Sequence, residues 1–264
     1  MMANQNMRHF RSVFISDVHL GYKGCNANLL ADFLKHTRTQ NLFLVGDIVD
    51  MISLRRTFYW PQAHNNVIRM LLGKAKHDTR VVYIPGNHDF PFREYCGLRF
   101  GNLEIRRRCR YTAADGRKYL VTHGDDYDGQ VRFSLGLKLV GYAFYEVIMR
   151  LNRSITAVRD QMGKDYWSLA TFLKEKSGSA KKYVDRYREA AMADARHHEL
   201  DGVICGHIHR PEITVIDGIR YLNDGDWVES CSVLVEHSDG EMELLHWPTE
   251  VRKRETQVVL PAAA

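Results

Sequence analysis

The chain has 264 residues, of which 45% are hydrophobic and 26% charged, and its net charge is +5. These values lie close to the average of soluble globular proteins, so they exclude a disordered, collagen-like or coiled-coil chain. No uncharged apolar run reaches the roughly 18 residues of a membrane span. The polar N-terminal residues lack the pattern of a secretory signal. We therefore expect a cytoplasmic protein that forms a single domain over residues 1–264.

The five cysteines are odd in number, and no two of them have CxxC spacing. This pattern predicts neither a disulfide framework nor a zinc–sulfur site. Cys205 and Cys231 lie in apolar runs, so we expect both to be small core residues.

Short apolar runs recur along the chain, and each is followed by a histidine, aspartate or asparagine. They read as buried strands and cover residues 12–15, 42–45, 81–84, 119–121 and 202–205. Apolar residues at helical spacing within 29–34 and 67–71 separate the first three strands. This alternation predicts an α/β layered fold. Further β-rich runs predict a second, more antiparallel sheet packed on the first; they cover residues 212–216, 219–222, 230–236 and 241–247.

Residues 128–200 interrupt the strand series with a helical, basic composition, so we expect a helical insert that caps the domain. From Asp128 to Glu199 there are 13 Lys or Arg and 9 Asp or Glu, which places most of the net charge here. Two apolar stripes at helical spacing run between Phe133 and Leu151. A surface helix needs only one stripe, so the second must cover something. Core packing, a homodimer, an acyl chain and a membrane surface remain alternatives.

Eight polar residues follow the predicted strands: Asp17, His19, Asp47, Asn87, His88, His123, His207 and His209. In α/β sheets, ligands bind beyond the carboxyl ends of the strands, where these side chains would meet. A single aspartate after a strand is ordinarily a turn residue. The recurrence of five histidines, two aspartates and an asparagine after successive strands points instead to one site.

The chemistry of these side chains predicts a centre for divalent metal ions. Carboxylate, imidazole and amide ligands suit Mn²⁺, Fe²⁺, Zn²⁺ or Co²⁺, and we expect Mn²⁺. In Asp17-x-His19 and His207-x-His209, alternate side chains lie on one side of an extended segment and can reach the same centre. Seven ligands suit two metals that share a bridging carboxylate, the arrangement that serves in-line phosphoryl displacement.

Five sequence blocks resemble those of the calcineurin-like metallophosphoesterase superfamily, and in the same order. They are Asp17-x-His19, Gly46-Asp47-x-x-Asp50, Gly86-Asn87-His88-Asp89, His123-Gly124-Asp125 and Gly206-His207-x-His209. The resemblance implies a four-layer αββα sandwich with a helical cap insertion. It implies a first metal held by Asp17, His19, Asp47 and His209, and a second held by Asp47, Asn87, His123 and His207. It also implies that His88 is catalytic and that Asp89 orients it.

One branch of this superfamily is most similar, the UDP-2,3-diacylglucosamine pyrophosphohydrolases of lipid A synthesis. The resemblance rests on residues 16–21, 123–125, 206–211 and 223–227. It implies hydrolysis of a nucleotide-linked acyl sugar to UMP and 2,3-diacylglucosamine 1-phosphate, by an enzyme peripheral to the inner membrane. His88 is a departure, because that branch often has Asn-Arg-Asp where this chain has Asn87-His88-Asp89.

Other functions stay open at this stage. The histidine at position 88 is compatible with a metallophosphodiesterase or phosphatase acting on another nucleotide, lipid or protein phosphate. Nucleic acid is not expected as a partner, because the basic surplus is modest and no aromatic-rich basic groove can be read. A non-enzymatic scaffold is a remote alternative, since all the ligand positions are present. We also expect Arg55, Arg56, Trp60 or Arg210 to be either cleft residues or plain loop residues.

Overall fold

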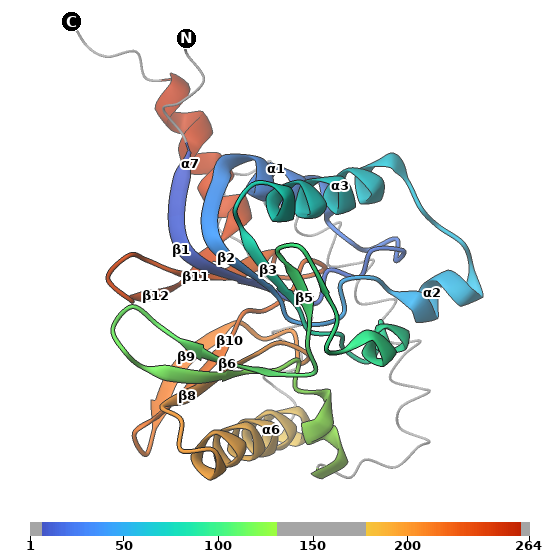
Figure 1. Cartoon of the computed structure of the whole chain (residues 1–264). Coiled ribbons are helices and arrows are strands. Elements are labelled where there is room, and N and C mark those ends of the chain that lie inside the picture. Colours follow the sequence, from blue (N-terminus) through green and yellow to red (C-terminus); the bar gives the residue numbers. More distant parts are fainter. Residues whose placement is uncertain (1–6, 131–177, 260–264) are drawn as a thin grey trace, which may run out of the picture.

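The computed structural model describes residues 7–130 and 178–259, which form two stacked β-sheets with helices on their outer faces (Figure 1). The first sheet has seven strands in the order β12-β11-β1-β2-β3-β5-β4. They are β1 (Arg8–Ile15), β2 (Thr37–Leu44), β3 (Arg80–Tyr83), β4 (Arg99–Phe100), β5 (Leu103–Ile105), β11 (Ser232–Glu236) and β12 (Met242–His246). The second has the order β6-β7-β8-β10-β9. Its strands are β6 (Cys109–Thr112), β7 (Lys118–Val121), β8 (Gly202–Cys205), β9 (Glu212–Ile216) and β10 (Ile219–Asn223).

The helices divide between the two outer faces. Figure 1 shows α1 (Ala27–His36), α3 (Gln62–Lys76) and α7 (Trp247–Val259) on the first sheet, and α6 (Gly178–His197) on the second. The short helix α2 (Met51–Arg56) and the 3-10 helices η1 (Phe90–Tyr95) and η2 (Asp125–Gln130) lie in loops. No helix among the described residues is long and apolar enough to cross a membrane.

Three apolar clusters hold the four layers together. One lies between the first sheet and its helices and includes Phe33, Val67 and Trp247. A second lies between the sheets, where the rings of Phe14 and Phe43 stack at 4.7 Å. A third joins α6 to the second sheet. The central strands are buried on both faces, so their sequences are continuously apolar rather than alternating. The expected αββα sandwich is therefore confirmed.

The helical spacings and the two cysteines agree with the structure. Leu30 and Phe33 of α1, and Val67 of α3, are fully buried. Cys205 and Cys231 are both buried, as expected of small core residues.

The prediction for the last four strands is wrong in one respect, because they do not form one sheet. The hairpin β9–β10 joins the second sheet through the parallel pair β8–β10, whereas β11–β12 joins the first sheet beside β1. The residues between β10 and β11 carry the chain from one sheet to the other. Within them Trp227 donates its backbone N–H to the carbonyl of Asp17. This crossing is a tertiary feature that strand patterning does not reveal. The same patterning also missed the short strands β4, β5 and β6.

Helix α6 lies in the range predicted as an insert, and it forms the outer layer of the second sheet. Tyr187 and Ala191 of α6 pack in the third apolar cluster with Val203 of β8 and Tyr221 of β10. The two apolar stripes expected between Phe133 and Leu151 lie outside the described residues.

The first apolar cluster supports the site through Phe33. This fully buried ring packs edge-on against Trp247 at 5.0 Å and lies 5.8 Å from Trp227, whose backbone contacts Asp17. Phe33→Ala should lower the free energy of unfolding by about 3–5 kcal/mol, because it leaves a cavity in a packed core. Urea denaturation would measure the loss. Leu72→Ala on α3, 56% exposed, is the control and should change stability by less than about 0.5 kcal/mol. Equal effects would contradict this packing account.

Candidate metal centre

The predicted ligands lie in loops that follow the carboxyl ends of five strands. Strands β1, β2 and β3 are parallel neighbours in the first sheet, and β7 and β8 are parallel neighbours in the second. Their ends meet at one edge of the sandwich. Five of the ligand residues have a left-handed backbone: Asp17 (φ 50°), His19 (φ 54°), Asp47 (φ 54°), His207 (φ 69°) and His209 (φ 52°). Residues held in this region persist only where their surroundings enforce it, and they cluster at functional sites.

Two glycines let the backbone close on these side chains. A Cβ atom at Gly86 would lie 2.3 Å from Asp47 Oδ1, and one at Gly206 would lie 2.5 Å from Asp17 Oδ2. Both separations are too short for a real carbon atom. The glycines of the third and fifth blocks are therefore required for the loops to pack against the two carboxylates.

Within residues 7–130 and 178–259, three groups of side chains present ligand atoms that lie within 4.8 Å of one another. They are Asp17 with His19 and His209; His19 with Asp47 and His88; and Asp47 with His123 and His207. Asp47 Oδ2 lies 3.4 Å from His123 Nε2 and 3.9 Å from His19 Nε2, so one carboxylate faces imidazoles from both sheets. A carboxylate that faces both sets of imidazoles has the reach to contact a metal ion in each set.

Asn87 completes the second set of donors. Its Oδ1 atom lies 3.2 Å from His123 Nε2, so the amide oxygen points at the same space as the imidazole. The structure thus brings together all seven residues that the sequence predicted as metal ligands.

The buried His19 Nε2 faces this space without a hydrogen-bond partner among the described residues, 3.7 Å from Asp17 Oδ1, which His209 Nε2 approaches to 3.1 Å. A buried polar atom without a partner is costly and calls for an explanation such as an ion. Oxygen and nitrogen donors converge here without a thiolate, which fits Mn²⁺, Fe²⁺, Zn²⁺ or Co²⁺. The residues present therefore fit divalent metal ions.

Contacts on the side of each imidazole that faces away from the centre determine which ring nitrogen points toward it. His123 Nδ1 lies 2.8 Å from the carbonyl oxygen of Val45, and His19 Nδ1 lies 3.2 Å from Asp50 Oδ2. An Nδ1–H donated to these acceptors leaves the Nε2 lone pair for a metal. Such outer partners orient metal ligands and raise their basicity.

The expectation that Asp89 orients His88 is not what the contacts show. Asp89 is fully buried and accepts hydrogen bonds from the backbone N–H of Ile48 and the hydroxyl of Tyr83, so it fastens the loop after β2. The carboxylate beside His88 is Asp50, whose Oδ1 lies 3.0 Å from His88 Nδ1. Asp50 thus contacts His19 and His88 together. The second aspartate of the Gly46-Asp47-x-x-Asp50 block was the available signal for this role.

Charge pairing dominates the centre when no metal is bound. Burial acts to raise the pKa of the Asp47 carboxyl, but the adjacent His123 and His19 outweigh burial and hold that pKa well below its usual range. Burial acts to lower the pKa of His123, but Asp47 raises it to about 10. The metal-free site is therefore held together by imidazolium–carboxylate pairs, whose protons a metal ion would displace.

These shifts predict opposite effects of pH on the metal-free and metal-bound protein. The folded pKa of His123 lies above its unfolded value of about 6.5, so its stabilising contribution is complete below that value and is lost as pH rises toward 10. Metal binding releases protons and strengthens as pH rises. In thermal melts, the metal-free protein should lose stability from pH 6.5 to 9. The rise in Tm on adding Zn²⁺ should be larger at pH 8 than at pH 6. A metal-induced rise that does not depend on pH would contradict the pairing.

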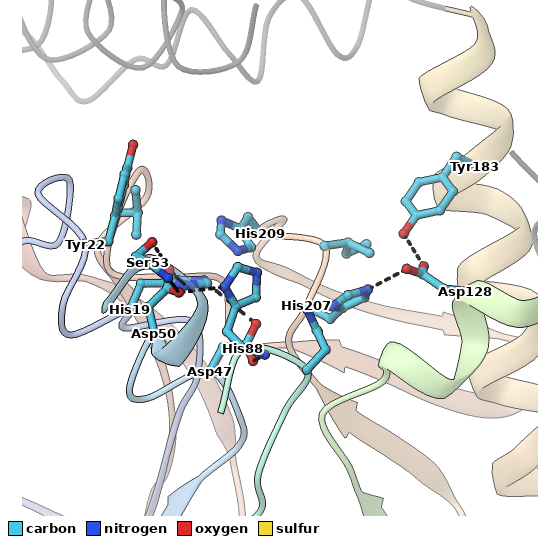
Figure 2. Close-up of a pocket in the computed structure, with 13 residues that line it drawn as sticks. His19, Tyr22, Asp47, Asp50, Ser53, His88, Asp128, Tyr183, His207 and His209 are labelled. Atoms are coloured by element: carbon cyan, nitrogen blue, oxygen red, sulfur yellow. Dashed lines mark hydrogen bonds and ion pairs between the residues drawn. The ribbon is translucent and has the colours of Figure 1, made fainter. Parts of the chain in front are cut away.

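A cavity of about 430 Å³ opens over the centre (Figure 2). It extends from His19 and His88 to Asp128 and Tyr183, and Tyr22 and Val228 also line it. Sequence reasoning missed Asp128, although it ends an acidic run directly after the fourth block, and gave no signal for Tyr183. The lining includes none of the four candidate cleft residues Arg55, Arg56, Trp60 and Arg210.

Comparison with known proteins identifies the family. The model of the calcineurin-like phosphoesterase family matches residues 10–211. The chain belongs to this family. UDP-2,3-diacylglucosamine hydrolase of Edwardsiella ictaluri (strain 93-146) is 25% identical over 219 residues, covering 76% of this chain and 77% of that protein. The protein of the same name from Marinobacter nauticus (strain ATCC 700491 / DSM 11845 / VT8) is 25% identical over 255 residues, covering 90% and 98%.

Among solved structures, hypothetical protein PH1004 from Pyrococcus horikoshii OT3 aligns with a TM-score of 0.48 at 10% identity, covering 96% of this chain and 95% of that one. The family match and the hydrolases among its relatives make this protein a metal-dependent hydrolase.

Proposed function

We propose that this protein is a two-metal pyrophosphohydrolase that converts UDP-2,3-diacylglucosamine to UMP and 2,3-diacylglucosamine 1-phosphate. One observation carries the reaction type: the Asp47 carboxylate belongs to two adjoining groups of ligand atoms, one from each side of the sandwich. Both relatives described above are named UDP-2,3-diacylglucosamine hydrolase, which supports the proposed substrate. A nucleotide-linked acyl sugar is thus the proposed partner.

The proposed ligands divide into two sets that share Asp47. The first set is Asp17, His19, Asp47 and His209, and the second is Asp47, Asn87, His123 and His207. When bound, the metals would generate a hydroxide nucleophile and stabilise charge on the phosphoryl oxygens. Mn²⁺ is the metal we propose, with Fe²⁺, Zn²⁺ and Co²⁺ as alternatives for this donor set.

His88 is the proposed catalytic histidine. Its side chain is 29% exposed and lines the cavity, while its backbone N–H donates to Asp47 Oδ1 at 2.7 Å. This backbone hydrogen bond holds the Cα atom of His88 close to the Asp47 carboxylate. Asp50, adjacent to Nδ1, holds the ring so that Nε2 is the nitrogen available to a phosphoryl or leaving-group oxygen.

The same histidine supports the second candidate function. Because the diacylglucosamine branch often has arginine at this position, His88 favours a metallophosphodiesterase or phosphatase on another nucleotide, lipid or protein phosphate. The metal centre and His88 would serve both reactions, so the substrate alone distinguishes them.

Hydrolysis of UDP-2,3-diacylglucosamine by the purified protein with Mn²⁺ tests the assignment. We expect UMP release that is abolished by a chelator and reduced at least about 1,000-fold by Asp47→Ala, because the shared ligand is lost. Asp115→Ala, at an exposed turn, is the matched control and should leave the rate unchanged. Cleavage of bis(p-nitrophenyl) phosphate without UMP release would reject the substrate and favour the second candidate.

A location at the cytoplasmic face of the inner membrane follows from the acyl chains of the proposed substrate. Polar replacement of Phe133, Leu137 and Phe144 should reduce turnover of the lipid substrate while sparing bis(p-nitrophenyl) phosphate, because in this proposal the apolar stripes of the insert bind the acyl chains. Co-sedimentation with vesicles containing anionic lipid should fall in parallel. Phe58→Ser, at a 79% exposed position, is the control. Equal loss with both substrates would contradict an acyl-binding role.

A further inference from the structure

His207 contacts Asp128, which in turn accepts a hydrogen bond from Tyr183, and the reaction as proposed uses neither residue. Asp128 Oδ2 lies 3.0 Å from His207 Nε2, and the Tyr183 hydroxyl donates to Asp128 Oδ1 at 2.6 Å (Figure 2). Asp128 lies in η2 and Tyr183 in the first turns of α6. The two residues therefore come from the chain segments on either side of residues 131–177 and meet at a proposed ligand.

We propose that Asp128 and Tyr183 are positioning residues for the second metal, which fix the tautomer and orientation of the His207 ring and link helix α6 to metal affinity. This inference rests on the proposed metal centre. It concerns one of the two ligand sets, the one formed by Asp47, Asn87, His123 and His207.

The tautomer follows from the chemistry of the contact. A carboxylate only accepts hydrogen bonds, so His207 Nε2 carries the hydrogen and Nδ1 holds the lone pair. Figure 2 shows Asp128 on the opposite side of His207 from Asp47, so the nitrogen bonded to Asp128 is turned away from the centre. His207 therefore offers Nδ1 to a metal, whereas His19 and His123 offer Nε2. Each of these three imidazoles has an acceptor on its outer nitrogen, as metal-ligating histidines require.

Helix α6 also holds the face of the ring. The Tyr187 ring stacks on His207 at a centroid distance of 6.0 Å and an interplanar angle of 29°. Tyr183 and Tyr187 are four residues apart on α6 and so lie on the same side of the helix. One contacts the ring and the other reaches its outer nitrogen through Asp128. A shift of α6 would therefore move both supports of His207 together.

Metal titration of the variants tests the inference, with calorimetry for affinity and Mn²⁺ electron paramagnetic resonance for the coupled pair. Asp128→Ala should lower the affinity for the second metal about 10–100-fold, because loss of the hydrogen-bond partner of a ligating histidine weakens metal binding by this factor. The affinity for the first metal should change by less than about twofold. Asp128→Asn keeps an acceptor oxygen and should restore most of the affinity. Tyr183→Phe leaves the carboxylate in place and should weaken the second metal only several-fold.

Asp126→Ala is the matched control. Asp126 lies two residues away with the same 41% side-chain exposure, but it pairs with Arg107 and not with His207. Its metal affinities should equal those of the wild type. Nitrogen-15 NMR of the Zn²⁺-loaded protein should place the His207 hydrogen on Nε2. A purely structural role of Asp128 would not determine this tautomer.

The outcomes separate this inference from the proposed function. If the wild type binds two metals and releases UMP, but Asp128→Ala binds both with unchanged affinity, the positioning role is wrong and the enzyme assignment stands. If Asp128→Ala lowers only turnover of the lipid substrate, Asp128 serves the substrate and the inference is again overturned. If the wild type binds fewer than two metals, the inference and the two-metal mechanism fall together.

Discussion

The structure depends on a carboxylate, that of Asp47, buried between imidazoles from two different sheets. A buried charge is tolerated only when it is paired or bound to a metal. Here His123 comes from the second sheet and His19 from the first, so the compensation of Asp47 requires the two sheets to be correctly stacked. The geometry of the site and the stacking of the two sheets therefore depend on each other. The loops after β1, β3 and β7 each bring a donor to this carboxylate, namely His19, the backbone N–H of His88 and His123.

The surrounding backbone is shaped by that requirement. Gly86 and Gly206 remove the Cβ atoms that would collide with the carboxylates of Asp47 and Asp17, and the ligand residues themselves adopt left-handed backbone conformations. Two further buried aspartates hold these loops in place. Asp89 accepts a hydrogen bond from the backbone N–H of Ile48, and Asp50 lies against the imidazoles of His19 and His88. Strained loops supported by buried carboxylates give a site that is organised before any substrate arrives.

The sequence located the candidate ligands, which the structure gathers at one edge of the sandwich, because each is encoded locally as a polar residue directly after a short apolar strand. Asp17, Asp47 and His123 could be read from their own strands without knowledge of the fold. Contacts between distant segments could not be read in this way. For example, the sequence predicted Asp89 as the partner of His88, but Asp50 lies beside it, because of how the two loops pack.

The two C-terminal hairpins show the same limit at the level of the fold. β9–β10 and β11–β12 have similar strand patterns, yet they join different sheets because the chain crosses the sandwich between them. Alternation of apolar residues specifies a strand and its buried face but not its neighbour. The pairing of Asp128 with Tyr183 was hidden for a related reason, since 54 residues of sequence separate them.

In the proposed function, Asp47 is shared between two metal ions. Anomalous diffraction from crystals grown with Mn²⁺ would test it most directly, because the manganese positions are located independently of any assumed ligand. The account predicts two peaks, one on each side of the Asp47 carboxylate, the first within reach of Asp17, His19 and His209 and the second within reach of Asn87, His123 and His207. A single peak, or two peaks that do not share Asp47, would contradict it.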